Sequence, residues 1–256
     1  FYDVLRYANG DFHKFRVRSL VGLIPLFAIE VLHRYELERN KTFLADMEWF
    51  IRNRPDLVGR ACSILGDADN RRYVLSVVDP HQFARVLERL VDPNEFLSAA
   101  GVRSLSKYHL EHPYVFGDLR LTYEPAESLQ KLKGGNSNWR GPVWFPTSYL
   151  LVESLLRFGE ALGPDFAVAS PEAGKSITPM ALAQDVANRM IAVFKRDEQG
   201  KRPCYGGTMK MQQDPYWRDY LLFHEYFHGD NGAGLGATHQ TGWTGLVANL
   251  IDEWRR

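Results

Sequence analysis

The stretch NSNWRGPVWFPTSYLLVESLLRFGEAL, residues 136–162, decides the fold expected for this chain. From Val143 to Leu162 its apolar residues recur at helical spacing, which predicts a long amphipathic helix. Pro142 stands directly before this segment. A proline fits the first turn of a helix because its missing N–H group costs no hydrogen bond there. We therefore expect a helix that begins at about Val143.

The residues before this helix predict a binding loop. Trp139 and Trp144 lie five positions apart, with Arg140 between them, in a string that neither a packed helix nor a packed strand favours. Loops that carry rigid aromatic rings and an arginine are often binding surfaces. Packing of the two rings in a loop core is the alternative interpretation of Trp139 and Trp144.

Helical periodicity also dominates the rest of the chain. Further helices are predicted over residues 19–37 (kinked at Pro25), 38–54, 80–92, 178–196, 216–227 and 241–256, and hairpins over 1–17 and 60–78, whereas 93–144 is irregular and 163–176 is a loop. Helices that alternate with loops holding the unusual residues are typical of antiparallel helix pairs with one working face. The predicted fold class is all-α, with one small β-hairpin insertion near 60–78.

The composition excludes several classes of protein. The 256 residues include 31 basic and 31 acidic side chains, so no net field attracts nucleic acid or an anionic membrane. There is no run of 18 apolar residues and no signal-like start. Two cysteines make neither a disulfide framework nor a metal site. We expect a soluble protein, in the cytoplasm rather than secreted, with no cofactor and no nucleic-acid or membrane partner.

Carboxylates near aromatic residues indicate carbohydrate chemistry. Glu225 is predicted to lie at a helix end beside Tyr226, where partial desolvation suits general acid–base work. A sugar stacks its C–H face on indole and receives hydrogen bonds from charged groups, which the Trp139 loop can provide. A structural salt bridge is the alternative role of Glu225. Glu124 and Glu127 are interpreted as a solvated turn or the start of a helix.

The sequence also contains partial matches to metal-binding and phosphate-binding patterns. His224, Glu225 and His228 match the short H-E-x-x-H pattern of zinc proteases, with His239 nearby. That pattern needs a helix that continues past the second histidine, whereas Gly229 would end it here. The glycine-rich segment 232–236 has neither the spacing nor the preceding strand of a nucleotide-binding loop. No metal is expected.

Several stretches together resemble glycoside hydrolase family 63, which includes processing α-glucosidases and mannosylglycerate hydrolase-like enzymes. The resembling stretches, in order, are NSNWRGPVWFPTSYLLVESL (136–155), DPYWRDYLLFHEYFHGDNGAG (214–234) and THQTGWTGLVANLI (238–251), with weaker support from FYDVL (1–5) and VRSLVGLIPLFAIE (17–30). The family resemblance implies an (α/α)6 toroid. Residues 1–256 would then be the C-terminal portion of one catalytic domain, with its N-terminal part upstream of Phe1.

The resemblance also implies an inverting mechanism with two carboxyl groups. Glu225 matches the general base, and Trp139, Arg140, Trp144, Tyr226 and Trp243 match residues that contact or border the sugar. The general acid of the family is an aspartate expected upstream of Phe1, so the isolated chain is expected to be nearly inactive. An oligosaccharide or small glycoside is the expected substrate. The alternatives are a non-catalytic carbohydrate-binding domain, or a trehalase-like or phosphorolytic enzyme on the same torus.

Overall fold

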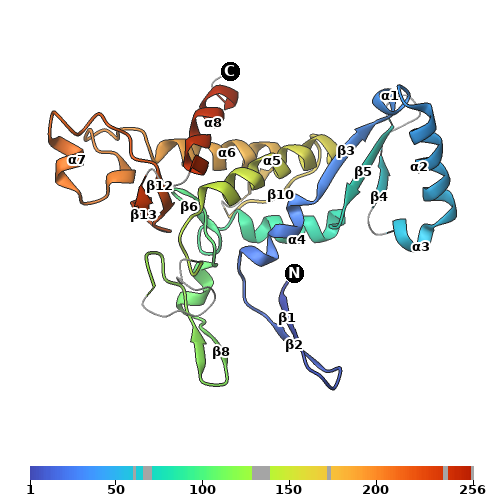
Figure 1. The fold of residues 1–256 in the computed structure, drawn as a ribbon, viewed down its shortest axis with the longest axis horizontal. Coiled ribbons are helices and arrows are strands. Elements are labelled where there is room, and N and C mark those ends of the chain that lie inside the picture. Colours follow the sequence, from blue (N-terminus) through green and yellow to red (C-terminus); the bar gives the residue numbers. More distant parts are fainter. Residues whose placement is uncertain (60–61, 66–70, 129–138, 172–173, 239–241, 255–256) are drawn as a thin grey trace.

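Three helices form the central layer of the molecule (Figure 1). The computed structural model describes residues 1–59, 62–65, 71–128, 139–171, 174–238 and 242–254. Helices α5 (Phe145–Leu162) and α6 (Pro179–Ala192) lie side by side, and α4 (Pro80–Leu90) lies below them in the figure. The remaining helical elements are α1 (Arg34–Leu37), α2 (Lys41–Asn53), α3 (Pro55–Val58), α7 (Met209–Gln213), α8 (Val247–Trp254) and the 3-10 helices η1 (Leu20–Gly22), η2 (Ile24–Phe27), η3 (Lys107–Leu110), η4 (Pro203–Tyr205) and η5 (Gly242–Leu246).

The core lies between these three helices because each presents an apolar face to the others. Leu151 and Leu155 of α5 and Val186 of α6 are almost completely buried. Phe83 of α4 stacks on Phe158 of α5, with 3.8 Å between ring centroids and 15° between ring planes. Each such side chain contributes about 1.5–3 kcal/mol by leaving water. This layer is the rigid support on which the loops of the candidate site rest.

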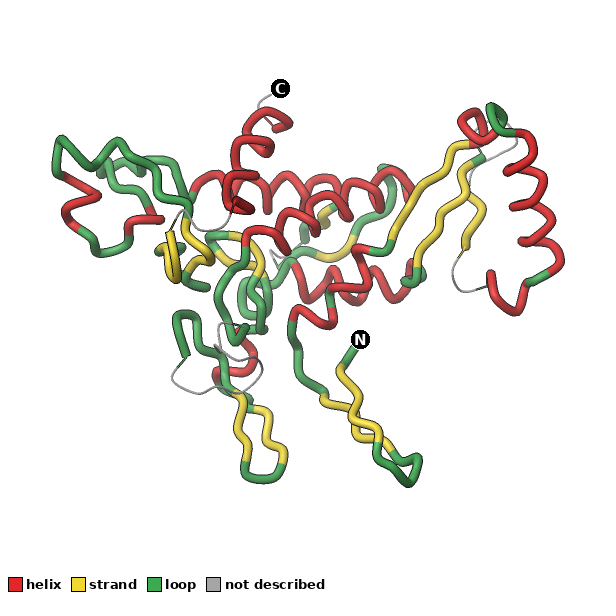
Figure 2. The backbone as a smooth tube through the Cα atoms, viewed as in Figure 1, coloured by secondary structure: helices red, strands yellow, loops and turns green. Residues whose placement is uncertain are grey.

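Short antiparallel strands surround the helical layer as separate yellow pieces (Figure 2). Within the described residues they form six small sheets. The pairs are β1 (Asp3–Arg6) with β2 (Phe12–Phe15), β6 (Leu97–Ser98) with β7 (Gly101–Val102), β8 (Tyr114–Phe116) with β9 (Leu119–Leu121), β10 (Val168–Ala169) with β11 (Ser176–Ile177) and β12 (His224–Phe227) with β13 (Gly234–Thr238), while β5 (Arg72–Ser76) lies between β3 (Ile29–His33) and β4 (Cys62–Leu65).

The predicted all-α fold, an incomplete (α/α)6 toroid, is therefore wrong for this structure. Helices account for 41% of the described residues and strands for 21%. The helices predicted over 38–54, 80–92, 143–162 and 178–196 are present as α2, α4, α5 and α6, and 241–256 contains η5 and α8. Both predicted hairpins are present as well. Helical periodicity did not predict the strands that lie between these elements.

The first missed strand lies in the segment 19–37, which was predicted as one kinked helix. Pro25 lies in the first turn of the short 3-10 helix η2, which begins at Ile24, instead of kinking a longer helix. The chain then extends into β3, where Val31 faces Val74 of β5. A short apolar run cannot be assigned to helix or strand by periodicity alone, and here the partner strand β5 decides.

The second missed strand carries the main candidate residue. Residues 216–227 were predicted as a helix, but His224–Phe227 form β12 and pair with β13. Aromatic side chains favour strands, and the glycine-rich turn after Phe227 returns the chain as a hairpin.

Among the residues that the structure describes, no helix is long and apolar enough to cross a bilayer.

Candidate active site

Four aromatic rings from three segments form one cluster beside the start of α5. Trp139 stacks on Trp144, with 4.2 Å between centroids and 5° between planes. Trp144 stacks in turn on Tyr226 of β12 at 4.8 Å and 24°. Trp243 of η5 meets Trp144 edge-on at 5.9 Å. The structure thus brings together all four aromatic residues that the sequence predicted for the site.

Burial differs along this stack. Trp144 and Tyr226 are 4% and 1% exposed, whereas Trp139 is only partly buried. Trp139 is therefore the member of the stacked series that offers a ring to solvent, and Trp144 and Tyr226 support it from behind. Trp243 is also partly exposed. Its indole N–H donates to the backbone oxygen of Glu225 at 3.0 Å.

Glu225 lies on β12 next to this cluster, not at a helix end as predicted. The register of β12 and β13 shifts between His224 and Tyr226, so Glu225 occupies an irregular position of the strand. Its side chain is half-buried. The Oε2 atom accepts a hydrogen bond from the backbone N–H of Ala237 at 3.3 Å. Within the described part of the chain, Oε1 has no hydrogen-bond partner, so one carboxylate oxygen is held and the other can accept a proton.

A glycine on the partner strand makes room for this carboxylate. Gly236 has a φ of +68°, in the region that side chains other than glycine rarely adopt. A Cβ atom at this position would lie 2.7 Å from Oε2 of Glu225 and 2.7 Å from Cε1 of Tyr226. Both contacts are too short for real atoms. Position 236 therefore requires glycine if Glu225 and Tyr226 are to keep their places.

Arg140 lies behind the aromatic stack. Its side chain is 0% exposed and forms an ion pair with Glu124. Burial lowers the pKa of the guanidinium group, which needs the carboxylate as compensation. The backbone of the two residues is also joined, because the N–H of Glu124 donates to the oxygen of Arg140 at 2.7 Å. In this structure Arg140 therefore faces the protein interior, and its predicted contact with a sugar stays a prediction.

Glu127 is the residue that sequence reasoning missed. It was assigned with Glu124 to a solvated turn or the start of a helix; it is indeed exposed, and its Oε1 also accepts a hydrogen bond from the Tyr226 hydroxyl at 3.0 Å. The spacing of the two glutamates carries no signal for this contact. Their partners Arg140 and Tyr226 come from other segments, and only the folded chain brings them together.

A buried polar network supports the loop from the other side. Arg103 donates to the Tyr123 hydroxyl at 3.0 Å and to the Gly229 backbone oxygen at 3.1 Å, and pairs with Asp230 at 3.1 Å. Burial opposes ionisation of Asp230, but the hydrogen bonds from Tyr123 and Arg103, together with the charges of Arg103 and Lys107, lower the pKa of the carboxyl. This network connects the turn after β12 to Arg103 and to the segment around Tyr123.

The geometry does not favour the zinc interpretation. His224 and His228 were considered as neighbours on one helical face, but they lie in a strand and in the turn that follows it. Nδ1 of His228 accepts a hydrogen bond from the N–H of Asp230 at 3.1 Å. His239 falls outside the described residues. Among the described positions, no group of three or more His, Cys, Asp or Glu residues could hold a metal ion.

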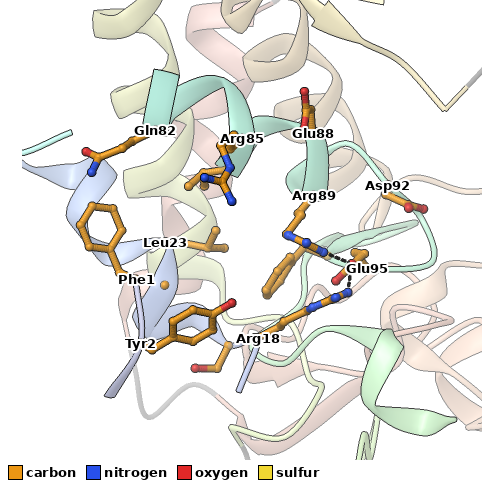
Figure 3. A pocket seen from close by; sticks show the side chains of 14 residues that line it. Phe1, Tyr2, Arg18, Leu23, Gln82, Arg85, Glu88, Arg89, Asp92 and Glu95 are labelled. Atoms are coloured by element: carbon orange, nitrogen blue, oxygen red, sulfur yellow. Dashed lines mark hydrogen bonds and ion pairs between the residues drawn. The ribbon is translucent and has the colours of Figure 1, made fainter. Parts of the chain in front are cut away.

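A cavity of about 510 Å³ lies between the start of the chain and α4, and Figure 3 shows the side chains that line it. Arg18 and Arg89 at its wall both pair with Glu95, and Arg85 points into it. None of the predicted site residues lines this cavity. The candidate active site is therefore the Glu225 region, where aromatic rings and carboxylates come together.

Comparison with known proteins finds relatives of this chain, and two of them are named as glucosidases. The chain is 43% identical to an uncharacterized protein of Saccharomyces cerevisiae over 99% of its own length and 24% of that protein. It is 27% identical to a probable mannosyl-oligosaccharide glucosidase of Schizosaccharomyces pombe, over 68% of this chain and 16% of that protein. The mannosyl-oligosaccharide glucosidase of Saccharomyces cerevisiae is 25% identical over 65% of this chain and 15% of its own length. The chain thus spans a quarter or less of these curated relatives.

A family model adds the decisive match. The mannosylglycerate hydrolase MGH1-like glycoside hydrolase domain matches residues 71–244, which is more than half of the chain. This range contains the Trp139 loop, β12 with Glu225, and Trp243. Together with the glucosidase relatives it confirms the predicted relation to glycoside hydrolase family 63. The chain belongs to the family of mannosylglycerate hydrolase MGH1-like glycoside hydrolase domains.

Proposed function

We propose that this chain supplies part of the active site of an inverting hydrolase that cleaves α-glucosidic or α-mannosidic bonds in an oligosaccharide or small glycoside. Glu225 is the general base that takes a proton from the attacking water. A general acid from a segment outside this chain protonates the leaving oxygen. Residues 1–256 are then the C-terminal portion of one catalytic domain.

One observation carries the proposal: the Glu225 carboxylate lies at the edge of the aromatic stack, and among the described residues one of its oxygens is hydrogen-bonded while the other has no partner. The N–H of Ala237 fixes Oε2, so Oε1 is the atom that accepts the proton of water. The family match and the relatives named as glucosidases support hydrolysis of a glycosidic bond.

The aromatic residues divide the binding work in this proposal. The partly exposed ring of Trp139 is the platform on which an apolar sugar face stacks, and Trp243 borders the site. Trp144 and Tyr226, which are buried, keep Trp139 and β12 in place. Arg140 acts from behind by anchoring the loop through Glu124. This assignment makes Trp139 the residue that determines affinity and Glu225 the residue that determines turnover.

The test uses a panel of α-glucosides and α-mannosides. Hydrolysis by this chain is compared with hydrolysis by a version extended upstream, and the anomer of the product is followed by NMR. The expected result is activity in the extended version alone, with inversion. Glu225→Gln in that version should lower kcat by a factor of about 100 or more, the scale of general-base removal, with KM nearly unchanged.

Other outcomes point elsewhere. Retention of configuration would contradict the inverting mechanism. Equal activity in both versions would place the acid within residues 1–256. Full activity of Glu225→Gln would remove Glu225 as base and favour a carbohydrate-binding role for this part of the protein. Dependence of turnover on phosphate would indicate a phosphorolytic enzyme.

A further inference from the structure

The hydroxyl group of Tyr226 is held by a carboxylate from a distant part of the chain. It donates to Oε1 of Glu127 at 3.0 Å, and the two residues are 99 positions apart. The Tyr226 ring is only 1% exposed, and a buried phenol needs an acceptor. Hydrogen bonds to a carboxylate are roughly twice as strong as those between neutral groups. Glu127 therefore fixes the phenol in one position.

The same ring shares a small volume with the Glu225 carboxylate. A Cβ atom at Gly236 would lie 2.7 Å from both Oε2 of Glu225 and Cε1 of Tyr226, so these two atoms are no more than twice that distance apart. Trp144 covers a face of the ring. The Tyr226 ring thus lies against the aromatic stack and beside the carboxylate proposed as base.

The protonation state of the phenol agrees with its role as a donor. Burial raises the pKa of the Tyr226 hydroxyl, and the hydrogen bond to Glu127 and the charge of Glu225 raise it further. The hydroxyl keeps its proton at neutral pH and can therefore donate a hydrogen bond to Glu127. Glu127 itself lies on the exposed side of the contact.

We propose that Glu127 is a positioning residue for the site: it holds Tyr226, and through the Tyr226 ring it fixes where the Glu225 carboxylate lies. This inference rests on the proposed function, because it assigns a role toward the base of that reaction. Precise placement matters for a base, since a misplacement of about 1 Å can lower the rate about 100-fold. Glu127 acts through Tyr226 and does not touch the reacting atoms.

The test compares four variants in the full-length protein. Glu127→Ala and Tyr226→Phe each lower kcat between about 10- and 100-fold, while KM changes less than about threefold, because the Tyr226 ring lies beside the base but is separated from the Trp139 platform by Trp144. The double variant is no worse than the more damaging single variant, since both remove one hydrogen bond. Glu127→Gln keeps an acceptor oxygen and recovers most of the lost kcat.

A second measurement does not depend on turnover. Near-UV circular dichroism reports the packing of Trp144 on Tyr226. Glu127→Ala should change this signal, and Glu127→Gln should leave it close to that of the natural protein. Because Tyr226→Phe preserves the buried ring, the test stands even if the alanine variant folds poorly.

Three results would overturn the role of Glu127. They are a Glu127→Ala variant with normal kcat, an effect confined to KM, and a double variant whose loss equals the product of the single losses. Glu225→Gln serves as the reference in the same assay. If Glu225→Gln is inactive while Glu127→Ala and Tyr226→Phe are normal, the positioning role alone fails. If Glu225→Gln is fully active, the proposed function itself fails.

Discussion

Gly236→Ala tests whether the hairpin of β12 and β13 is built around the Glu225 carboxylate. The new methyl group would meet Oε2 of Glu225 and Cε1 of Tyr226 at 2.7 Å and Cβ of Glu225 at 3.0 Å. An ordinary contact begins at 3.4 Å, so the carboxylate and the ring must each move away from the methyl group by at least about 0.7 Å, a sizeable part of the 1 Å that lowers rates about 100-fold.

Two terms add up in the stability of this variant. Holding alanine at a positive φ costs about 1–2 kcal/mol, and the extra methyl group costs about 1–3 kcal/mol by overpacking. The free energy of unfolding should therefore fall by about 2–5 kcal/mol. In an active full-length protein, kcat should fall between about 10- and 100-fold because the base has moved.

Gly200→Ala is the matched control. Gly200 has a similar φ of +74°, but nothing lies within 4 Å of a Cβ built there. This variant should show the backbone cost of about 1–2 kcal/mol alone and normal kcat. Urea unfolding gives the two free energies, and initial rates give kcat. The reasoning fails if the two variants are equally stable, or if Gly236→Ala turns over substrate like the natural protein.

Three further predictions follow from burial. Trp144→Ala should lower the free energy of unfolding by about 3–5 kcal/mol. Trp139 lies at the partly exposed end of the stack, so Trp139→Ala should lower it less and mainly raise KM. Equal losses of stability in the two variants would contradict this division. Burial raises the pKa of the Cys204 thiol to about 12 and that of the Cys62 thiol by less. A thiol reagent at pH 8 should therefore modify Cys62 first. Rapid labelling of Cys204 in the folded protein would contradict this prediction. Burial lowers the pKa of His228 below its ordinary 6.5, so the folded state binds fewer protons than the unfolded state and stability falls as the pH drops below about 6.5. Between pH 7.5 and 5.5 the urea midpoint of the natural protein should fall more than that of His228→Gln; parallel curves would show that His228 contributes nothing.

The sequence was sufficient for the elements that carry a strong local signal. The helix after Pro142 begins at Phe145, two residues from the predicted start, and it ends at Leu162 as predicted. The Trp139 loop was located because its composition excludes regular structure. These predictions hold because periodicity and proline placement act within a few residues of the chain.

Strands and distant pairs were beyond such reasoning. β12 was predicted as the end of a helix over 216–227, and only its pairing with the glycine-rich β13 decides otherwise. The Glu127–Tyr226 hydrogen bond is a tertiary contact, and the sequence around neither residue indicates it. For the same reason the all-α expectation failed, since each missed strand depends on a partner elsewhere in the chain.

The two halves of the candidate site are joined by backbone rather than by the side chains that would meet a sugar. The N–H of Val143 donates to the oxygen of Phe227 at 2.8 Å, and the reverse bond is 2.9 Å. A Cβ atom at Gly229 would lie 2.5 Å from the oxygen of Gly141, so the two loops touch without any side chain between them. Such contacts do not depend on which aromatic residue occupies the platform. In the proposed function, a substitution of Trp139 should therefore change sugar binding while Glu225 keeps its position relative to the start of α5.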